Sequence, residues 1–134
     1  MRRFLQTMVL TAIASGTLLA QDSAQLDRCL DKANTQLAMN SCANEEVLRV
    51  DAELKGLEQK LALAARTEPG ASDKIEAVAK AWIAYRDAYL EAMYPAKDKQ
   101  AAYGSIFRME IGLLRAKLAR RQIQALRELL KQYE

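Results

Sequence analysis

Apolar residues recur every three or four positions along most of this chain, which is the period of an amphipathic helix. The pattern predicts four helices, near residues 23–33, 36–67, 73–94 and 105–132. The breaks between them carry turn residues, because Pro69 and Gly70 follow the second segment and Pro95 follows the third. No alternating strand pattern of useful length occurs. We therefore predict an all-α fold, an antiparallel bundle of about four helices.

The same period identifies the predicted core. The second segment has a seam with spacings of three and four, formed by Asn40, Ala43, Val47, Val50, Leu54, Leu57, Leu61 and Ala64. The third segment has one stripe, which Ile83 and Leu90 widen: Ile75, Val78, Trp82, Tyr85 and Tyr89. The last segment has two stripes, Phe107, Ile111, Leu114 and Leu118, then Ile123, Leu126 and Leu130. These faces should pack against one another.

Ser and Thr residues mark the expected helix starts. Thr35 is a predicted N-cap of the long second helix, because its hydroxyl can accept from a free backbone N–H of the first turn. Ser72 or Asp73 should cap the third helix, and Ser105, after Gly104, should cap the last one.

The only two cysteines, Cys29 and Cys42, lie on either side of Thr35 at similar separations. In one continuous helix they would be about 20 Å apart, whereas a disulfide needs Cα atoms within about 7 Å. If one helix ends near Ala33 and another begins after Thr35, the two can fold back and the cysteines can meet. We predict a disulfide-stapled helical hairpin, which the chain-entropy model values at roughly 3 kcal/mol. Two free buried thiols are the alternative.

The N-terminus resembles a secretory signal peptide. A basic start with Arg2 and Arg3 precedes an uncharged apolar run that ends at Ala20, so we predict that residues 1–20 are a signal peptide cleaved after Ala20. An uncleaved membrane anchor is the alternative, although the run is slightly short for a span. No cysteine lies near the cut, which argues against a lipid anchor. We expect residues 21–134 to form a single periplasmic or secreted domain, in a compartment where disulfides persist.

Charge and composition narrow the possible functions. Loss of Arg2 and Arg3 from 20 basic residues leaves 18 against 17 acidic ones, so the mature chain has a formal charge of +1. A nucleic-acid partner is therefore not indicated, and strong attraction to a membrane surface is not expected. The chain has no histidine, the commonest general base and metal ligand, and its glycines are too scattered for a phosphate loop. We predict a binding protein without enzymatic activity, metal or cofactor.

The last segment has a basic face, formed by Arg108, Arg115, Lys117, Arg120, Arg121 and Arg127. This face could bind an acidic partner. The simpler interpretation is a solvated face, paired with acids on neighbouring turns such as Glu110 and Glu128.

Three motifs occur in order along the chain. The first is Thr35-Gln36-x-x-Met39-Asn40-x-Cys42-Ala43-x-x-x-Glu46, the second is Ala81-Trp82-x-x-Tyr85-Arg86-Asp87, and the third is Gly104-Ser105. Together, behind a signal peptide, they resemble the lysozyme inhibitor LprI-like family of small exported bacterial proteins. The resemblance extends over about residues 26–130. It implies a helical domain that binds a lysozyme or a related peptidoglycan-cleaving enzyme.

The chain departs from this family in two places. Family members usually have Glu three residues after the threonine, where this chain has Ala38. They typically also carry a second cysteine pair, in regions that here read Ala88-Tyr89-Leu90 and Gly112-Leu113-Leu114. Packing must replace that second bridge, and the residues expected to supply it are Tyr89, Leu90, Leu113 and Leu114.

The second motif has two interpretations. Trp82 and Tyr85 can belong to the core, with Arg86 paired across the bundle to Glu46 or Glu45 and Asn40 satisfying backbone groups near the hairpin. Alternatively, Arg86 and Asp87 form a recognition surface.

Three functions remain open. The first is an inhibitor that occludes the cleft of a lysozyme, for which the connection 95–103, with Lys97, Lys99 and Tyr103, is the best candidate contact. The second is an envelope module with an adaptor or chaperone-like role, since fold does not fix function. The third is an immunity protein against a wall-degrading toxin.

Overall fold

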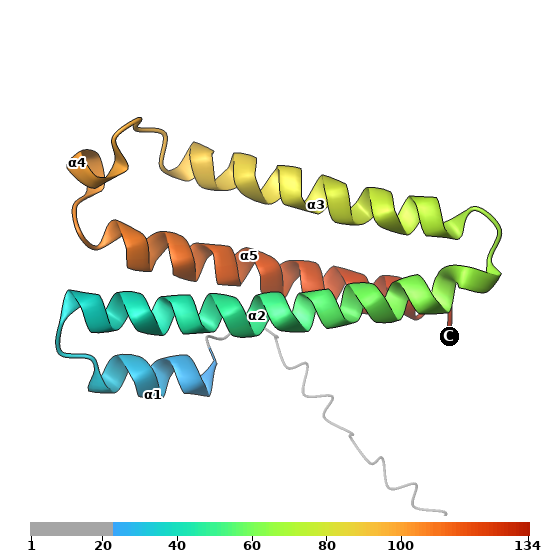
Figure 1. The fold of residues 1–134 in the computed structure, drawn as a ribbon, viewed down its shortest axis with the longest axis horizontal. Coiled ribbons are helices and arrows are strands. Elements are labelled where there is room, and N and C mark those ends of the chain that lie inside the picture. The colour runs from blue at the N-terminus through green and yellow to red at the C-terminus, as the bar shows by residue number, and fades with distance from the viewer. Residues whose placement is uncertain (1–22) are drawn as a thin grey trace, which may run out of the picture.

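Three long helices run side by side along the molecule, and two short ones lie near one end (Figure 1). The structure is a computed structural model that describes residues 23–134, so the predicted signal peptide lies outside the described residues. The helices are α1 (Ala24–Lys32), α2 (Gln36–Ala64), α3 (Ala71–Met93), α4 (Lys99–Tyr103) and α5 (Phe107–Leu130), with a 3₁₀ turn at Ala65–Thr67. The described part contains no strand, which confirms the all-α prediction. None of its helices is long and apolar enough to cross a membrane.

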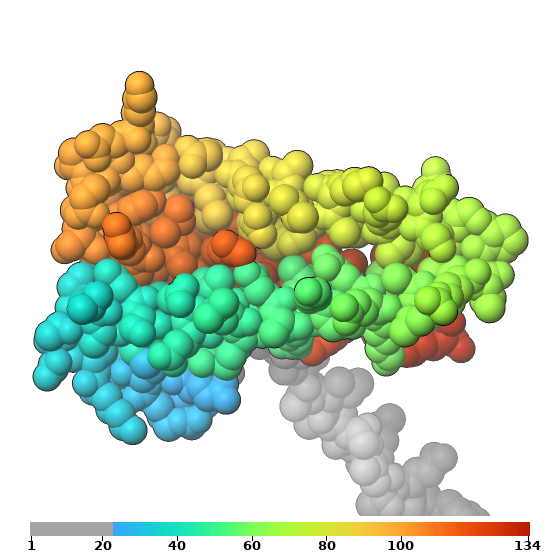
Figure 2. Space-filling model, viewed as in Figure 1, coloured from blue at the N-terminus to red at the C-terminus, as the bar shows by residue number. Residues whose placement is uncertain are grey.

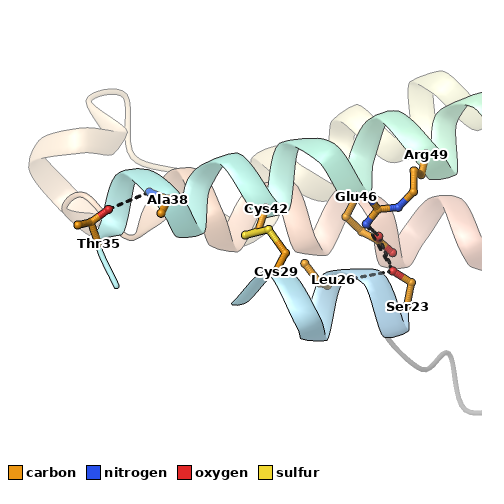
Figure 3. The surroundings of a disulfide bond; sticks show 8 residues. All are labelled: Ser23, Leu26, Cys29, Thr35, Ala38, Cys42, Glu46 and Arg49. Carbon is orange, nitrogen blue, oxygen red and sulfur yellow. Dashed lines mark hydrogen bonds and ion pairs between the residues drawn. A yellow bond between two sulfur atoms is a disulfide. The ribbon is translucent and has the colours of Figure 1, made fainter. Parts of the chain in front are cut away.

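The predicted N-terminal hairpin is present. The Ser23 hydroxyl caps α1 by accepting from the backbone N–H of Leu26 at 3.1 Å, and the Thr35 hydroxyl caps α2 by accepting from Ala38 at 3.1 Å. Between these caps the chain reverses, so α1 lies against the first half of α2 (Figures 1 and 3). Cys29 and Cys42 are bonded, with their Cα atoms 5.7 Å apart.

The contact between α2 and α5 forms the centre of the core. The predicted α2 seam is confirmed, with Ala43, Val47, Val50, Leu54 and Leu61 buried. On α5, the second predicted stripe is fully buried and Leu118 is 2% exposed. The helices approach closely where Gly112 faces Ala43, since a Cβ at Gly112 would stand 3.4 Å from that of Ala43. Small side chains on both helices permit this approach.

Helix α3 packs along a narrower strip than its sequence pattern predicts. Trp82 and Ile75 are buried, 7% and 8% exposed, but Tyr85 is 55% exposed and Ile83 is 49% exposed. The core prediction for Tyr85 and Ile83 is therefore wrong. Both residues lie at the margins of the apolar stripe. A helix that packs against its neighbours along a narrow strip buries only the residues in the middle of its stripe. The Tyr85 ring contacts Trp82 and Tyr89 instead, with centroids 6.3 and 5.9 Å apart.

Part of the packing expected to replace a second disulfide is confirmed. Tyr89, Leu90 and Leu114 are partly buried and pack against the core. Leu113 is partly exposed and lies outside that cluster.

The predicted caps of the last two long helices are wrong. Gly70, in the left-handed region at φ 76°, precedes α3, which begins at Ala71, so Ser72 and Asp73 lie inside its first turn. Helix α5 begins at Phe107, after Ile106, and no side chain caps it. Ser105 therefore lies in the turn before the helix. A glycine can turn the chain before α3 without a side-chain cap, because it tolerates positive φ.

The connection 95–103 contains a short helix that the sequence pattern did not predict. Asp98 caps α4, because its carboxylate accepts from the backbone N–H of Ala101 at 2.9 Å. Gly104 ends it with φ 74°. Five residues are too few to display a helical period, so only the capping aspartate and the terminal glycine could have indicated it.

The burial of Trp82 makes its truncation costly. We expect Trp82→Ala to lower the free energy of unfolding by about 3–5 kcal/mol, measured by urea denaturation. Tyr85→Ala is the matched control on the same helix, and it should cost less than about 1.5 kcal/mol because the ring is largely in water. Equal losses from the two substitutions would contradict the placement of α3.

Candidate functional site

An aromatic cluster closes the end of the bundle where α3, α4 and α5 meet. Tyr94 contacts Tyr103 and Phe107 edge-on, with centroids 5.2 and 4.9 Å away, and Tyr103 stacks on Phe107 at 5.7 Å. The Tyr103 hydroxyl also accepts from the backbone N–H of Ala96 at 3.1 Å. These contacts hold the connection 95–103 in one shape. We call this end, residues 94–107, the corner.

The two lysines of the corner have different environments. The Lys99 ammonium donates to Glu91 at 2.9 Å and to the carbonyl of Ala96 at 3.3 Å, so it fastens α4 to the end of α3. Lys97 is exposed, and no hydrogen bond or ion pair joins it to any other residue in the described range 23–134. The segment between α3 and α4 projects from the body of the molecule (Figure 2). Lys97 is thus the cation of the corner that is available to a partner.

Tyr94 links the corner to α5. Partial burial, followed by the nearby Glu110 carboxylate, raises the pKa of the Tyr94 phenol above its usual range. The hydroxyl donates to that carboxylate at 3.5 Å. This bond joins the end of α3 to the first turn of α5.

Arg86 and Asp87 bond to each other on α3. The Asp87 carboxylate accepts from the Arg86 guanidinium through Nε at 2.8 Å and through a terminal nitrogen at 2.7 Å. The expectation that Arg86 pairs with Glu46 or Glu45 is therefore wrong. Arg86 lies seven residues before the end of α3 at Met93, which places the pair about 10 Å along the helix from the corner. The structure thus keeps the Arg86–Asp87 pair apart from Lys97 and Tyr103.

Glu46 is the buried acid of the bundle, with 1% of its surface exposed. Its carboxylate forms an ion pair with Arg49 of α2 and accepts from the Ser23 hydroxyl at 2.7 Å (Figure 3). It also forms an ion pair with Arg120 of α5. Two cations and a hydroxyl offset the cost of burying one charge. Glu46 therefore connects α1, α2 and α5. The i,i+3 spacing of Glu46 and Arg49 was the only local signal for this network.

The basic face of α5 makes its ion pairs across the bundle. Arg115 donates to Asp51 at 2.6 Å, and Arg127 donates to Glu53 at 2.6 Å, both on α2. The expected pairing with acids on neighbouring turns is wrong for these arginines. Glu128 instead accepts from Lys131 at 2.9 Å. Arg108, Lys117 and Arg121 remain exposed and form no ion pair within residues 23–134.

Among the hollows between the helices of residues 23–134, two bear on the site. The first, of about 430 Å³, lies where α2, α3 and α5 meet. Its lining is Asn40, Asn44, Val47, Leu90, Arg108, Ile111, Gly112 and Arg115, and we call it the polar groove. Asn40 accepts here from the Gln36 side chain at 2.9 Å, so the expected bonds from Asn40 to backbone groups are replaced by a side-chain bond. The sequence pattern placed Asn40 and Ile111 on inward faces but gave no sign of a hollow between them.

The second hollow, of about 470 Å³, lies between α2 and α3 and is mostly apolar. Leu61, Ile75 and Val78 contribute its walls. Glu58 also lines it, and burial raises the pKa of the Glu58 carboxyl above its usual range. This acid makes no ion pair within the described residues, so its charge is poorly compensated.

Comparison with protein families gives a match over most of the chain. The family model described as lysozyme inhibitor LprI matches residues 29–126. No curated protein matches the chain, and neither does any solved structure. The matched range extends from the first cysteine into the last turns of α5 and includes the corner, the polar groove and Glu46.

The Glu46 network should be critical for stability. Glu46→Leu removes the carboxylate that faces the Arg120 guanidinium, whose side chain is 16% exposed, and should cost about 3–5 kcal/mol in urea denaturation. Adding Arg120→Met in the same chain should recover part of that loss, because the cost of desolvating the guanidinium, which the Glu46 carboxylate no longer offsets, is then removed as well. A double variant less stable than Glu46→Leu alone would contradict this account.

Glu58 should make stability depend on pH. A carboxyl with a raised folded pKa opposes folding when it is ionised, so this penalty is absent below its unfolded pKa and grows as pH rises through the folded pKa. Glu58→Gln should therefore raise the melting temperature at neutral pH and have little effect at pH values acidic enough to protonate Glu58. Glu45→Gln, at an exposed position of α2, controls for the change in net charge. A benefit from Glu58→Gln that persists undiminished in acid would argue against the burial effect.

Proposed function

Because the chain belongs to the LprI family of lysozyme inhibitors, we propose that it inhibits a lysozyme or related peptidoglycan-cleaving enzyme by placing the corner in the substrate cleft. The mature chain, after loss of residues 1–20, acts in the periplasm or outside the cell. Inhibition of this kind needs no chemistry from the inhibitor.

The observation that supports this most is the contrast between a fixed backbone and a free cation at the corner. Glycosidases of this class use two carboxylates in a groove, and the exposed Lys97 ammonium is a suitable partner for them. The stacking of Tyr103 on Phe107 and the bonds of Lys99 hold the segment before any partner arrives. A segment that is already ordered loses little entropy on binding, which favours affinity.

This proposal assigns different roles to the predicted site residues. Lys97 contacts the enzyme, whereas Lys99 and Tyr103 hold the segment that carries it. The Arg86–Asp87 pair lies outside the inserted part, on the side of α3. With a mature formal charge of +1, the protein gains little from long-range attraction to an enzyme. Affinity then depends on local contacts at the corner.

Reversing the charge of Lys97 tests the proposal. Lys97→Glu would place a carboxylate next to the enzyme's own carboxylates, and like charges at an interface are unfavourable. We expect the inhibition constant for a susceptible lysozyme, measured by lysis of a cell-wall suspension, to rise at least about tenfold, which corresponds to about 1.4 kcal/mol. Helix content by circular dichroism should be unchanged.

The matched control is Lys74→Glu, which makes the same charge change at an exposed position near the other end of α3. Its inhibition constant should equal that of the unmodified chain. If both variants raise the inhibition constant equally, or if neither changes it, the corner does not contact the enzyme as proposed. If the mature chain fails to bind animal, phage and bacterial lysozymes alike, the envelope adaptor function is favoured instead.

A further inference from the structure

The polar groove is large enough to hold a small molecule. Its volume of about 430 Å³ lies within the range of ligand pockets. Three helices contribute to it, so its shape is set by the packing of the core: Asn40 and Asn44 come from α2, Leu90 from α3, and Arg108 from α5. The corner does not line it, so the groove is a separate feature from the proposed enzyme contact.

The polar groups of the groove are mainly hydrogen-bond donors. Asn40 already uses its carbonyl oxygen for Gln36, which leaves its amide N–H groups. One terminal nitrogen of Arg115 donates to Asp51, while its Nε–H is buried and has no acceptor among residues 23–134. Arg108 makes no ion pair or hydrogen bond with any other residue in the range 23–134. A ligand that enters this groove must therefore supply acceptors.

The remaining walls are apolar. Val47 is buried, and Leu90 and Ile111 are partly exposed, so the groove offers hydrocarbon surface beside its donors. Charge also favours an anionic ligand. Asp51 pairs with Arg115, but no acid within residues 23–134 pairs with Arg108. A buried N–H without an acceptor is unfavourable, and two guanidinium groups that line the same groove favour a carboxylate, which accepts charge-assisted bonds at its oxygens.

We propose that the polar groove binds a small organic acid through its carboxylate, with Arg108 and Arg115 as the anion-binding groups and Asn40 and Asn44 binding neighbouring polar atoms. Two sources of such a carboxylate suit a protein of the cell envelope, an acidic amino sugar and the C-terminus of a short peptide. This choice of ligands rests on the proposed function, but the binding itself involves no enzyme.

The experiment is calorimetric titration of the mature chain with two matched pairs of probes. N-acetylmuramic acid is compared with N-acetylglucosamine, which lacks the lactyl carboxylate, and D-alanyl-D-alanine is compared with its C-terminal amide. At least one acid should bind at millimolar or lower concentration, and its neutral counterpart should bind at least tenfold more weakly. The acid that binds identifies the source. If neither acid binds, or if each neutral counterpart binds as well as its acid, the proposal is overturned.

A pair of variants locates the binding. Arg108→Gln should weaken the binding of the acid at least tenfold, whereas Arg121→Gln, the same change at an exposed position of the same helix outside the groove, should leave it unchanged. Amide chemical shifts of Asn44 and Gly112 should move on titration. Equal weakening by the two variants would show general charge attraction and would exclude the groove as the site. Because no lysozyme is present, this result is independent of the outcome of the inhibition assay.

Discussion

The packing of α2 against α5 is the contact on which the other parts of this structure depend. Ala43 and Gly112 let the two backbones approach, and the buried aliphatic residues of both helices close the seam from there to the α2–α3 turn. Each other element attaches to this pair. Helix α1 is bonded to α2 through the disulfide, and α3 covers one edge of the pair with Trp82 at its centre. The corner and the polar groove exist because this pair positions the ends of three helices.

Charge placement reinforces the same pair. The ion pairs from Arg115, Arg120 and Arg127 all reach acids on α2, and they are spaced along α5. The exposed pairs contribute little individually to stability. The buried pair at Glu46 differs, because a one-turn slip of α5 would separate the Glu46 carboxylate from Arg120. We interpret this network as a constraint on the register of the two helices.

Much of this fold could be predicted from the sequence, because its signals are local. The helix order could be predicted from the 3.5-residue seam and the two prolines. The stapled hairpin could be predicted from the two cysteines on either side of a capping threonine. The predictions failed where neighbouring helices decide the outcome. Tyr85 has the right spacing for the core but lies outside the strip that α3 buries. Arg86 pairs with the adjacent Asp87, while Glu46 pairs with Arg49 of its own helix and with Arg120 of α5. The polar groove joins residues of three helices, so no short stretch of sequence could indicate it. At the corner, the sequence indicated two lysines and an aromatic residue, but only the folded contacts distinguish Lys97 from Lys99.

The position of the disulfide has a consequence for how the molecule opens. The bond joins α1 to α2, and no disulfide restrains α3, whose buried surface is a narrow strip around Ile75 and Trp82. Native proteins open in cooperative units, and units with few buried apolar contacts open at the lowest free energy. The backbone amides of α3 should therefore exchange with solvent by a local opening that leaves α2 and α5 paired. A partner that binds the C-terminal end of α3 would suppress this opening. It would then slow amide hydrogen exchange along the whole of α3, including turns that it does not contact.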